Sequence, residues 1–133
     1  FKQYSKNGRN LLPGGKDIAP LFSPIYKEAN QRGALRNLTI ADEKGEVLTT
    51  CVLLNSHCTT HYFIGLNNQE IKNTMANFRL VYQSIEMSKD ASTIFDFNGS
   101  MIEGVESFFR GFGATPVPYL AIEKVKFPVN WAR

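Results

Sequence analysis

The sequence predicts an α/β (α+β) domain with a mixed sheet and the element order α-β-β-β-α-β-α-β. Three observations support this class. Three apolar stretches with strand-like patterns follow one another over residues 35–65. Two amphipathic helical patterns come next, and each is followed by a further apolar stretch. A three-stranded meander that continues into alternating helices and strands is expected to form one sheet with parallel and antiparallel pairs.

Length and composition agree with one domain. The chain has 133 residues, of which 43% are hydrophobic and 20% charged, so it can bury a core without disulfides or metals. These fractions exclude a disordered tail, a collagen-like fibre and a coiled coil. No apolar run reaches the roughly 20 residues of a membrane helix, so no membrane span is expected. The net charge of +3 comes from scattered Lys and Arg, which suits an anionic ligand such as a nucleotide phosphate and does not by itself indicate nucleic acid.

The first helix is expected over residues 21–32. Ser23 followed by Pro24 is typical of an N-cap and a first helical residue, and Gly33 is a natural stop. The preceding residues 1–20 are rich in Lys, Asn, Gly and Pro, so we expect an N-terminal arm or linker and a domain over 21–133. The chain begins with Phe1 and not with Met, so we expect a processed protein or a piece of a longer one.

Three antiparallel strands are predicted over residues 35–41, 46–54 and 58–65. A hairpin loop at 42–45 with a closing glycine joins the first two, and a turn at 55–57 joins the next two. The two cysteines lie beside this turn and out of cross-strand register, so no disulfide is expected. Together with an N-terminus that does not resemble a signal peptide, this cysteine usage predicts a cytoplasmic protein.

The second half of the chain is predicted to alternate between helices and strands. Apolar residues at spacings of four and three predict a helix over 69–88 whose buried face carries Ile71, Met75, Phe78, Tyr82 and Ile85. Asn67 and Glu70 resemble a capping box for this helix. A strand over 93–97, a helix from about residue 101 with a phenylalanine-rich core face, and a strand over 117–125 complete the order.

Two segments are candidates for a ligand site. The strand, loop and helix over 58–72 would present free backbone N–H groups at a helix N-terminus, which suits a diphosphate at 65–70, although an ordinary capped helix gives the same pattern. In the second segment, Asp96, Asn98 and Ser100 follow the end of a short strand, where ligands of open α/β sheets bind. The alternative is that Asp96 or Ser100 caps the next helix.

Other chemistry is weakly indicated. Cys51, His57, Cys58 and His61 fit no zinc-ligand spacing, so no metal is expected. Nucleotide-binding and hydrolase signatures are absent from the sequence. Arg110 either points to solvent or faces an anion.

Residues 93–124 carry a family resemblance. The turn DFNGS at 96–100, the helix end FFRGFG at 108–113 and the strand opening PY at 118–119 resemble the C-terminal GNAT-like domain of FemAB-like proteins, within the GNAT acyltransferase superfamily. The segment SKNGRN at 5–10 is similar to the Ser-x-Asn-x-Arg segment that enters this domain.

The resemblance implies an N-acyltransferase that uses acetyl-CoA or another acyl-CoA and an amine-bearing acceptor. It places the pyrophosphate on the loop after the third strand and the thioester carbonyl on a backbone N–H of that strand. The cofactor-binding residues that it implies are Phe63, Ile64, Gly65, Asn67, Asn68 and Gln69. Arg110 would stand in for a lysine that stabilises the oxyanion. The candidates for handling the amine proton are Asp96, Glu103 and Tyr119.

The FemAB-like branch implies a different donor and acceptor. Its members transfer an aminoacyl group from aminoacyl-tRNA onto a peptide of a cell-wall precursor, and they carry two such domains with a groove between them. The loop at 65–69 does not reproduce the usual glycine-rich GNAT pattern. The alternative is therefore a non-catalytic half-domain that completes a substrate groove with a second GNAT-like domain or as a homodimer. A further alternative is a small α/β ligand-binding module without acyl chemistry.

Overall fold

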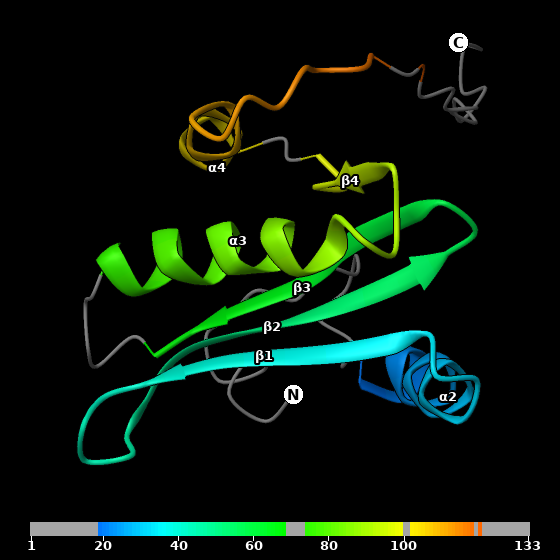
Figure 1. The fold of residues 1–133 in the computed structure, drawn as a ribbon, viewed down its shortest axis with the longest axis horizontal. Coiled ribbons are helices and arrows are strands. Elements are labelled where there is room, and N and C mark those ends of the chain that lie inside the picture. The colour runs from blue at the N-terminus through cyan, green and yellow to red at the C-terminus, as the bar shows by residue number, and fades with distance from the viewer. Residues whose placement is uncertain (1–18, 69–73, 100–101, 119, 121–133) are drawn as a thin grey trace, which may run out of the picture.

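A four-stranded sheet with helices on both faces forms the body of the molecule (Figure 1). The computed structural model describes residues 19–68, 74–99, 102–118 and 120. Its elements are α2 (Ala19–Gln31), β1 (Leu35–Ala41), β2 (Val47–Ser56), β3 (Thr59–Asn67), α3 (Thr74–Ser88), β4 (Ile94–Asp96) and α4 (Glu103–Arg110). The strands follow the order β1-β2-β3-β4, with antiparallel pairs up to β3 and a parallel β3–β4 pair. The predicted mixed sheet is thus confirmed.

The end of the predicted element order differs. Val117, Pro118 and Leu120 belong to no strand, and the rest of the expected strand over 117–125 lies outside the described residues. Among the described residues, no helix combines the length and the apolar character that crossing a membrane requires.

The hairpin between β1 and β2 closes as the sequence predicts. The Asp42 carboxylate accepts hydrogen bonds from the backbone N–H groups of Lys44 and Glu46, both at 2.9 Å, and Gly45 adopts a φ of +83°. The expected absence of a disulfide is also confirmed, because Cys51 is a buried free thiol and Cys58 an exposed one.

Helix α2 begins at Ala19, so the prediction that Ser23 caps it was wrong. Pro24 lies inside the helix, where it cannot donate to the carbonyl of residue 20. The helix packs on the face of the sheet opposite α3, and it is joined to β1 by a hydrogen bond of 2.8 Å from the Asn37 amide to the Tyr26 hydroxyl. It also reaches two residues into the segment expected to be an arm.

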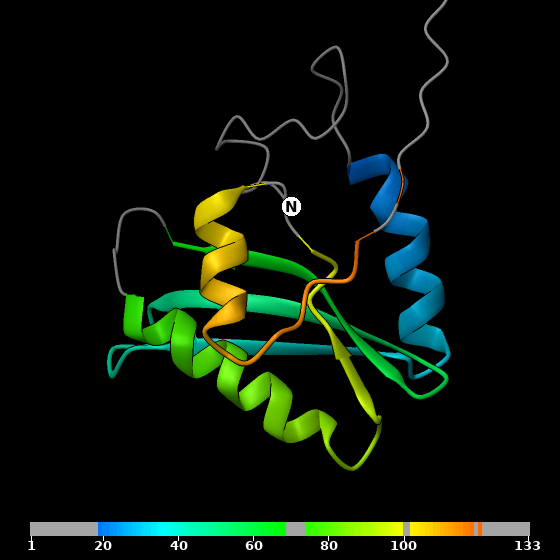
Figure 2. The ribbon, with the colours of Figure 1, turned by 90° about the horizontal axis from the view of Figure 1, so that it is seen from above.

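Helix α3 covers the other face of β1 and β2 (Figure 2). Its buried residues are Ala76, Leu80, Val81, Ser84 and Ser88. The predicted face was wrong, since Met75 is 72% and Tyr82 59% exposed. The small side chains on the buried face let the helix approach the sheet closely, and Leu80 joins a core of Leu38, Cys51 and Leu53.

Helix α4 packs through aromatic rings, but none of its residues is fully buried. Phe97 and Phe109 stack with ring centroids 4.5 Å apart, and Phe78 of α3 meets Phe108 edge-on at 4.9 Å. The predicted phenylalanine face of this helix therefore forms a half-buried aromatic cluster and not a closed core. We define this aromatic cluster as Tyr62, Phe78, Phe97, Phe108, Phe109 and Phe112.

Candidate active site where β3 and β4 part

Strands β3 and β4 run together for only three residue pairs. The last pair is His61 with Asp96, where β4 ends, while β3 continues to Asn67. Residues 62–67 of β3 therefore have no partner in β4, and we call this stretch the β3–β4 split. Backbone N–H and C=O groups need hydrogen-bond partners. Where two neighbouring strands of a sheet separate, the groups that faced the lost neighbour can bind a ligand instead.

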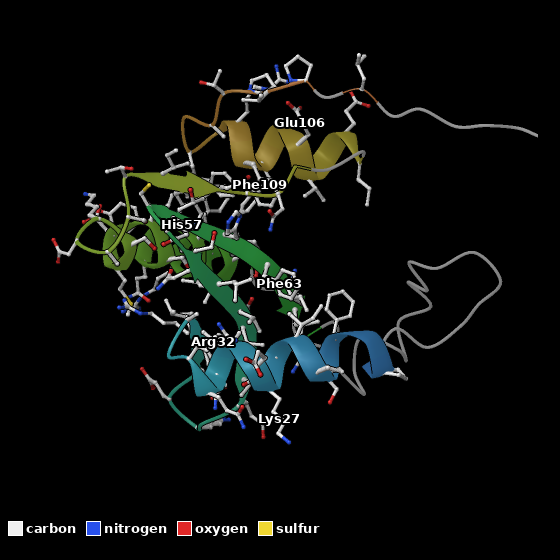
Figure 3. All side chains as sticks on the ribbon, turned by 90° about the vertical axis from the view of Figure 1, so that its right-hand side faces the viewer. Lys27, Arg32, His57, Phe63, Glu106 and Phe109 are labelled. Atoms are coloured by element: carbon white, nitrogen blue, oxygen red, sulfur yellow. The ribbon has the colours of Figure 1, made fainter. Side chains whose placement is uncertain are left out.

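A β-bulge lies at the start of the split. Val52 pairs with Ile64 and Leu53 with Tyr62, which leaves Phe63 as the extra residue in β3. Bulges bend a strand and re-aim its groups, and they are common beside active sites. The Phe63 ring points toward α2, where it meets Phe22 edge-on at 5.4 Å (Figure 3).

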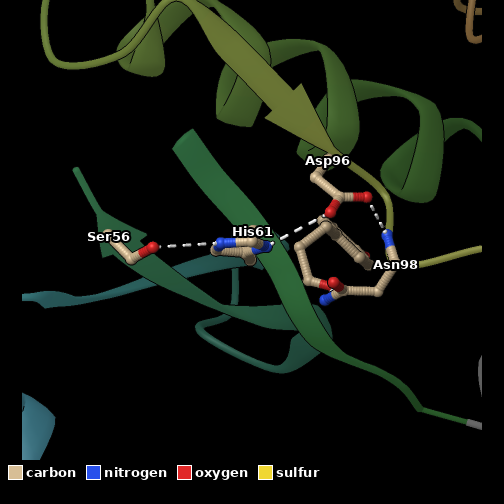
Figure 4. Close-up of polar contacts among 5 residues, drawn as sticks. Ser56, His61, Asp96 and Asn98 are labelled. Atoms are coloured by element: carbon tan, nitrogen blue, oxygen red, sulfur yellow. Dashed lines mark hydrogen bonds and ion pairs between the residues drawn. The ribbon is translucent and has the colours of Figure 1, made fainter. Parts of the chain in front are cut away.

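Asn98 spans the gap immediately after β4. Its side-chain amide donates a 3.1 Å hydrogen bond to the carbonyl of Tyr62, and its backbone N–H donates to the Asp96 carboxylate at 2.8 Å (Figure 4). The residue adopts a φ of +58°, a left-handed conformation that asparagine tolerates better than most residues. The backbone pairing of β4 with β3 ends at Asp96. The Asn98 side chain then supplies one further hydrogen bond to β3.

The face of the sheet opposite α3 carries a row of three polar side chains (Figure 4). His61 Nδ1 lies 3.3 Å from Asp96 Oδ2, and His61 Nε2 lies 3.4 Å from the hydroxyl of Ser56. Side chains alternate between faces along a strand, so His61 points away from the α3 face on which Tyr62 joins the core. We call Ser56, His61 and Asp96 the polar row.

The α3 side of the split is lined by Tyr62. Its ring packs against Phe97 and Phe109, and its hydroxyl lies 2.6 Å from the position that a Cβ atom on Gly65 would occupy. Only glycine at position 65 leaves room for this phenol. Burial raises the pKa of Tyr62, so the phenol remains protonated at neutral pH.

The residues at the end of β3 brace the sheet. Asn67 Oδ1 accepts a 2.9 Å hydrogen bond from the hydroxyl of Thr49. Asn68 donates from its backbone N–H to the Leu48 carbonyl and from its side chain to the Val47 carbonyl. Gln69 and Glu70, which the phosphate and capping-box predictions require, lie outside the described residues.

The predicted catalytic residues do not all meet. Asp96 lies at the split beside the strand that carries Phe63 and Ile64. Arg110 is exposed on α4 and its guanidinium donates to Glu106, while Tyr119 lies outside the described residues.

Sequence reasoning missed the partners of Asp96. His61 falls within a predicted strand and Ser56 within a predicted turn, and the register between β2 and β3 is what places them on one face of the hairpin. No group of three potential metal ligands occurs within residues 19–68, 74–99, 102–118 and 120.

Comparison with known proteins identifies the fold. No family model and no curated protein matches the sequence. A protein of Pyrococcus furiosus classed as an acetyl transferase superposes with a TM-score of 0.75 at 7% identity, covering 93% of this chain and 90% of that one. The chain has the GNAT fold. Glucosamine-6-phosphate N-acetyltransferase of Arabidopsis thaliana shares this fold with a TM-score of 0.59 at 12% identity, over 96% of this chain and 90% of its own.

A third GNAT-fold structure was solved with a cofactor analogue. It is AAC(6')-Iy in complex with the bisubstrate analogue CoA-S-monomethyl-acetylneamine, which superposes with a TM-score of 0.63 at 10% identity. The match covers 95% of this chain and 91% of that enzyme. At such identities the shared feature is the GNAT fold itself.

Proposed function

We propose that this chain is an N-acyltransferase that moves an acyl group from an acyl-CoA thioester to a primary amine. The observation that carries the proposal is the parting of β3 from β4 after the His61–Asp96 pair, two residues before the bulge at Phe63. This arrangement leaves backbone groups of β3 without a partner in β4 at the place where the sheet also carries a histidine and a carboxylate.

The acyl donor would lie along the β3–β4 split. A backbone N–H of Phe63 or Ile64 at the bulge would donate to the thioester carbonyl and stabilise the negative charge that develops on its oxygen. The segment from Gly65 to Asn68 leads toward α3, and the pyrophosphate would bind there with Gln69. The net positive charge of the chain suits this anionic cofactor.

Proton transfer would run through His61. His61 Nδ1 lies 3.3 Å from the Asp96 carboxylate, so Asp96 would favour a proton on Nδ1 and a lone pair on Nε2. As the amine nitrogen attacks the carbonyl carbon and the C–S bond breaks, Nε2 takes up the proton that the amine loses. Asp96 thus acts by orienting His61. Arg110 stays a candidate for stabilising the oxyanion and Tyr119 for handling the amine proton. Arg110 would have to exchange Glu106 for the oxyanion.

A half-domain without catalysis is the second candidate. Tyr62, Phe97 and Phe109 pack together on the α3 side of the split, and the Tyr62 phenol covers Gly65. A domain that only completes a groove with a second GNAT-like domain, as in the FemAB-like branch with its aminoacyl-tRNA donor and peptide acceptor, would not need to admit the pantetheine arm there.

The thermal unfolding midpoint in the presence of CoA or acetyl-CoA separates the two candidates. A ligand that binds only the native state raises the midpoint. We expect a rise for the unmodified chain and for Gly104→Ala, whose new Cβ would meet no atom within 4 Å. We expect a smaller rise or none for Gly65→Ala, because the added Cβ must displace the Tyr62 side chain, which lines the split.

Catalysis is measured as release of free CoA thiol in the presence of primary amines of different size. We expect release with at least one amine and loss of release in His61→Gln with CoA binding retained. An unchanged midpoint with either cofactor, together with self-association in sedimentation, would instead support the half-domain.

A further inference from the structure

We propose that Ser56 is an activated nucleophile and that the polar row takes acyl groups from activated carboxylic esters without CoA. Ser56, His61 and Asp96 have the connectivity of a nucleophile, a base and a residue that orients the base, with contacts of 3.4 and 3.3 Å. Such sites are recognised by geometry and not by the order of residues in the chain.

The backbone fixes where the three side chains lie. His61 pairs across the hairpin with Leu54, and Ser56 follows two residues later on the same face of β2. Asp96 is the direct partner of His61 in the parallel pair. The turn between β2 and β3 is in turn tied to β4, because the carbonyl of Cys58 accepts from two backbone N–H groups, those of residues 93 and 94. The polar row thus connects three strands that are held in register.

The position of Asp96 favours one tautomer of His61. One oxygen of Asp96 accepts from the backbone N–H of Asn98, and the other faces Nδ1 of His61. Because a carboxylate only accepts hydrogen bonds, we assign the proton to Nδ1, which leaves a lone pair on Nε2 for the contact with the Ser56 hydroxyl. The distances of 3.4 and 3.3 Å are long for hydrogen bonds. Catalytic hydrogen bonds are often long in unliganded sites and shorten when substrate binds.

The polar row is accessible to a substrate. Ser56 is exposed, and the side chains of His61 and Asp96 are 26% and 46% exposed. Partly exposed polar contacts of this kind contribute little to the free energy of folding. Stabilising the pairing of β4 with the sheet therefore does not explain the polar row. The accessible Ser56 hydroxyl, which faces Nε2 of His61, instead suits attack on a small acyl group.

The step balances with the residues of the polar row. Ser56 Oγ attacks the ester carbonyl carbon and its proton passes to Nε2 of His61. The new Oγ–C bond forms as the bond to the leaving alcohol breaks, and the proton on Nε2 goes to that alcohol or to solvent. Water then attacks the acyl-serine with His61 as the base, and the carboxylic acid and the free serine are released.

The test uses p-nitrophenyl acetate without CoA, followed by peptide mass mapping. Because the exposed thiol of Cys58 also reacts with esters, all proteins carry Cys58→Ala. We expect a burst of p-nitrophenolate and an acetyl adduct on Ser56. Ser56→Ala should lose the adduct, and His61→Gln should form it about 100-fold more slowly, the usual range for loss of a general base. Ser107→Ala, a change at an exposed serine of α4, is the matched control.

Asp96 acts by positioning His61. Its role is therefore tested by a property of the His61 imidazole that a loss of stability alone would not change. We expect Asp96→Asn to slow the adduct and to change the tautomer of His61, measured by nitrogen-15 NMR of the imidazole. Adducts only on lysines, or equal rates in His61→Gln, would overturn the proposal. The midpoint shift with CoA is measured separately, so a Ser56 adduct without that shift would retain this proposal and reject the CoA-dependent one.

Discussion

The thiol of Cys51 lies 3.4 Å from the hydroxyl of Ser84, and both side chains are completely buried between β2 and α3. The hydroxyl also donates a 2.7 Å hydrogen bond to the carbonyl of Leu80 one turn earlier in the helix. A serine that satisfies its hydroxyl within its own helix can face a sheet without leaving a polar group unpaired. This arrangement therefore allows the Ser84 side of α3 to face the core.

The two cysteines are expected to react at very different rates. Burial raises the pKa of the Cys51 thiol and shields it from reagents, whereas Cys58 is exposed in the turn after β2. In the folded protein Ellman's reagent should modify Cys58 promptly and Cys51 only as fast as the protein unfolds. The time course of absorbance measures this, with Cys58→Ser as the control that removes the fast phase. Two fast phases would contradict the buried position of Cys51.

Substitutions on α3 test which face of the helix is buried. Leu80→Ala removes a fully buried side chain from the core and should lower the free energy of unfolding by about 2–5 kcal/mol. Tyr82→Ala lies on the face that the sequence pattern favours but is 59% exposed, so we expect a change of about 0.5 kcal/mol or less. Urea denaturation measures both values.

The comparison between the losses of unfolding free energy in Leu80→Ala and Tyr82→Ala shows which face of α3 is buried. If Tyr82→Ala destabilised the protein more than Leu80→Ala, the face predicted from apolar spacing would be the buried one after all. Far-UV circular dichroism of each variant provides the control that the helix is retained.

The strands could be predicted from the sequence, whereas the orientation of α3 could not. Alternation of apolar residues and the Gly45 hairpin identify β1 and β2 because a strand has only two faces. A helix offers many orientations, and hydrophobicity favours large residues such as Met75 and Phe78 over the small ones that permit close approach. Phe78 in fact packs against Phe108 of α4, a partner that spacing along one helix does not reveal.

The site was predicted in part for a similar reason. Asp96 follows from a general rule, since ligands of α/β sheets bind at the carboxyl ends of strands. The bulge at Phe63 has no evident sequence signal, and His61 gains its two partners only through the register of β2, β3 and β4. Contacts that depend on register between strands cannot be obtained from one strand at a time.

Asn98 is expected to stabilise the folded protein both through its side-chain amide and through its backbone conformation. Asn98→Gly keeps the positive φ and removes the hydrogen bond to the Tyr62 carbonyl, which should cost about 0.5–1.5 kcal/mol. Asn98→Ala removes the same bond and also places a Cβ in the left-handed region, which adds about 1–2 kcal/mol. The free energy of unfolding in urea gives both values, and equal stability of the two variants would contradict the left-handed conformation at this position.

Arg110 is expected to matter for the proposed transfer reaction and not for folding. Its guanidinium is exposed and donates to Glu106 on the surface of α4, so Arg110→Ala should leave the unfolding midpoint nearly unchanged. If the guanidinium leaves Glu106 to stabilise an oxyanion, Arg110→Ala should lower the rate of CoA-dependent transfer by about 100-fold, as loss of an oxyanion donor does. Glu106→Gln is the matched variant, because it loosens the ion pair while keeping Arg110, and we expect it to retain or increase the rate. Initial rates of thiol release measure both, and full activity in Arg110→Ala would remove this residue from the transfer reaction.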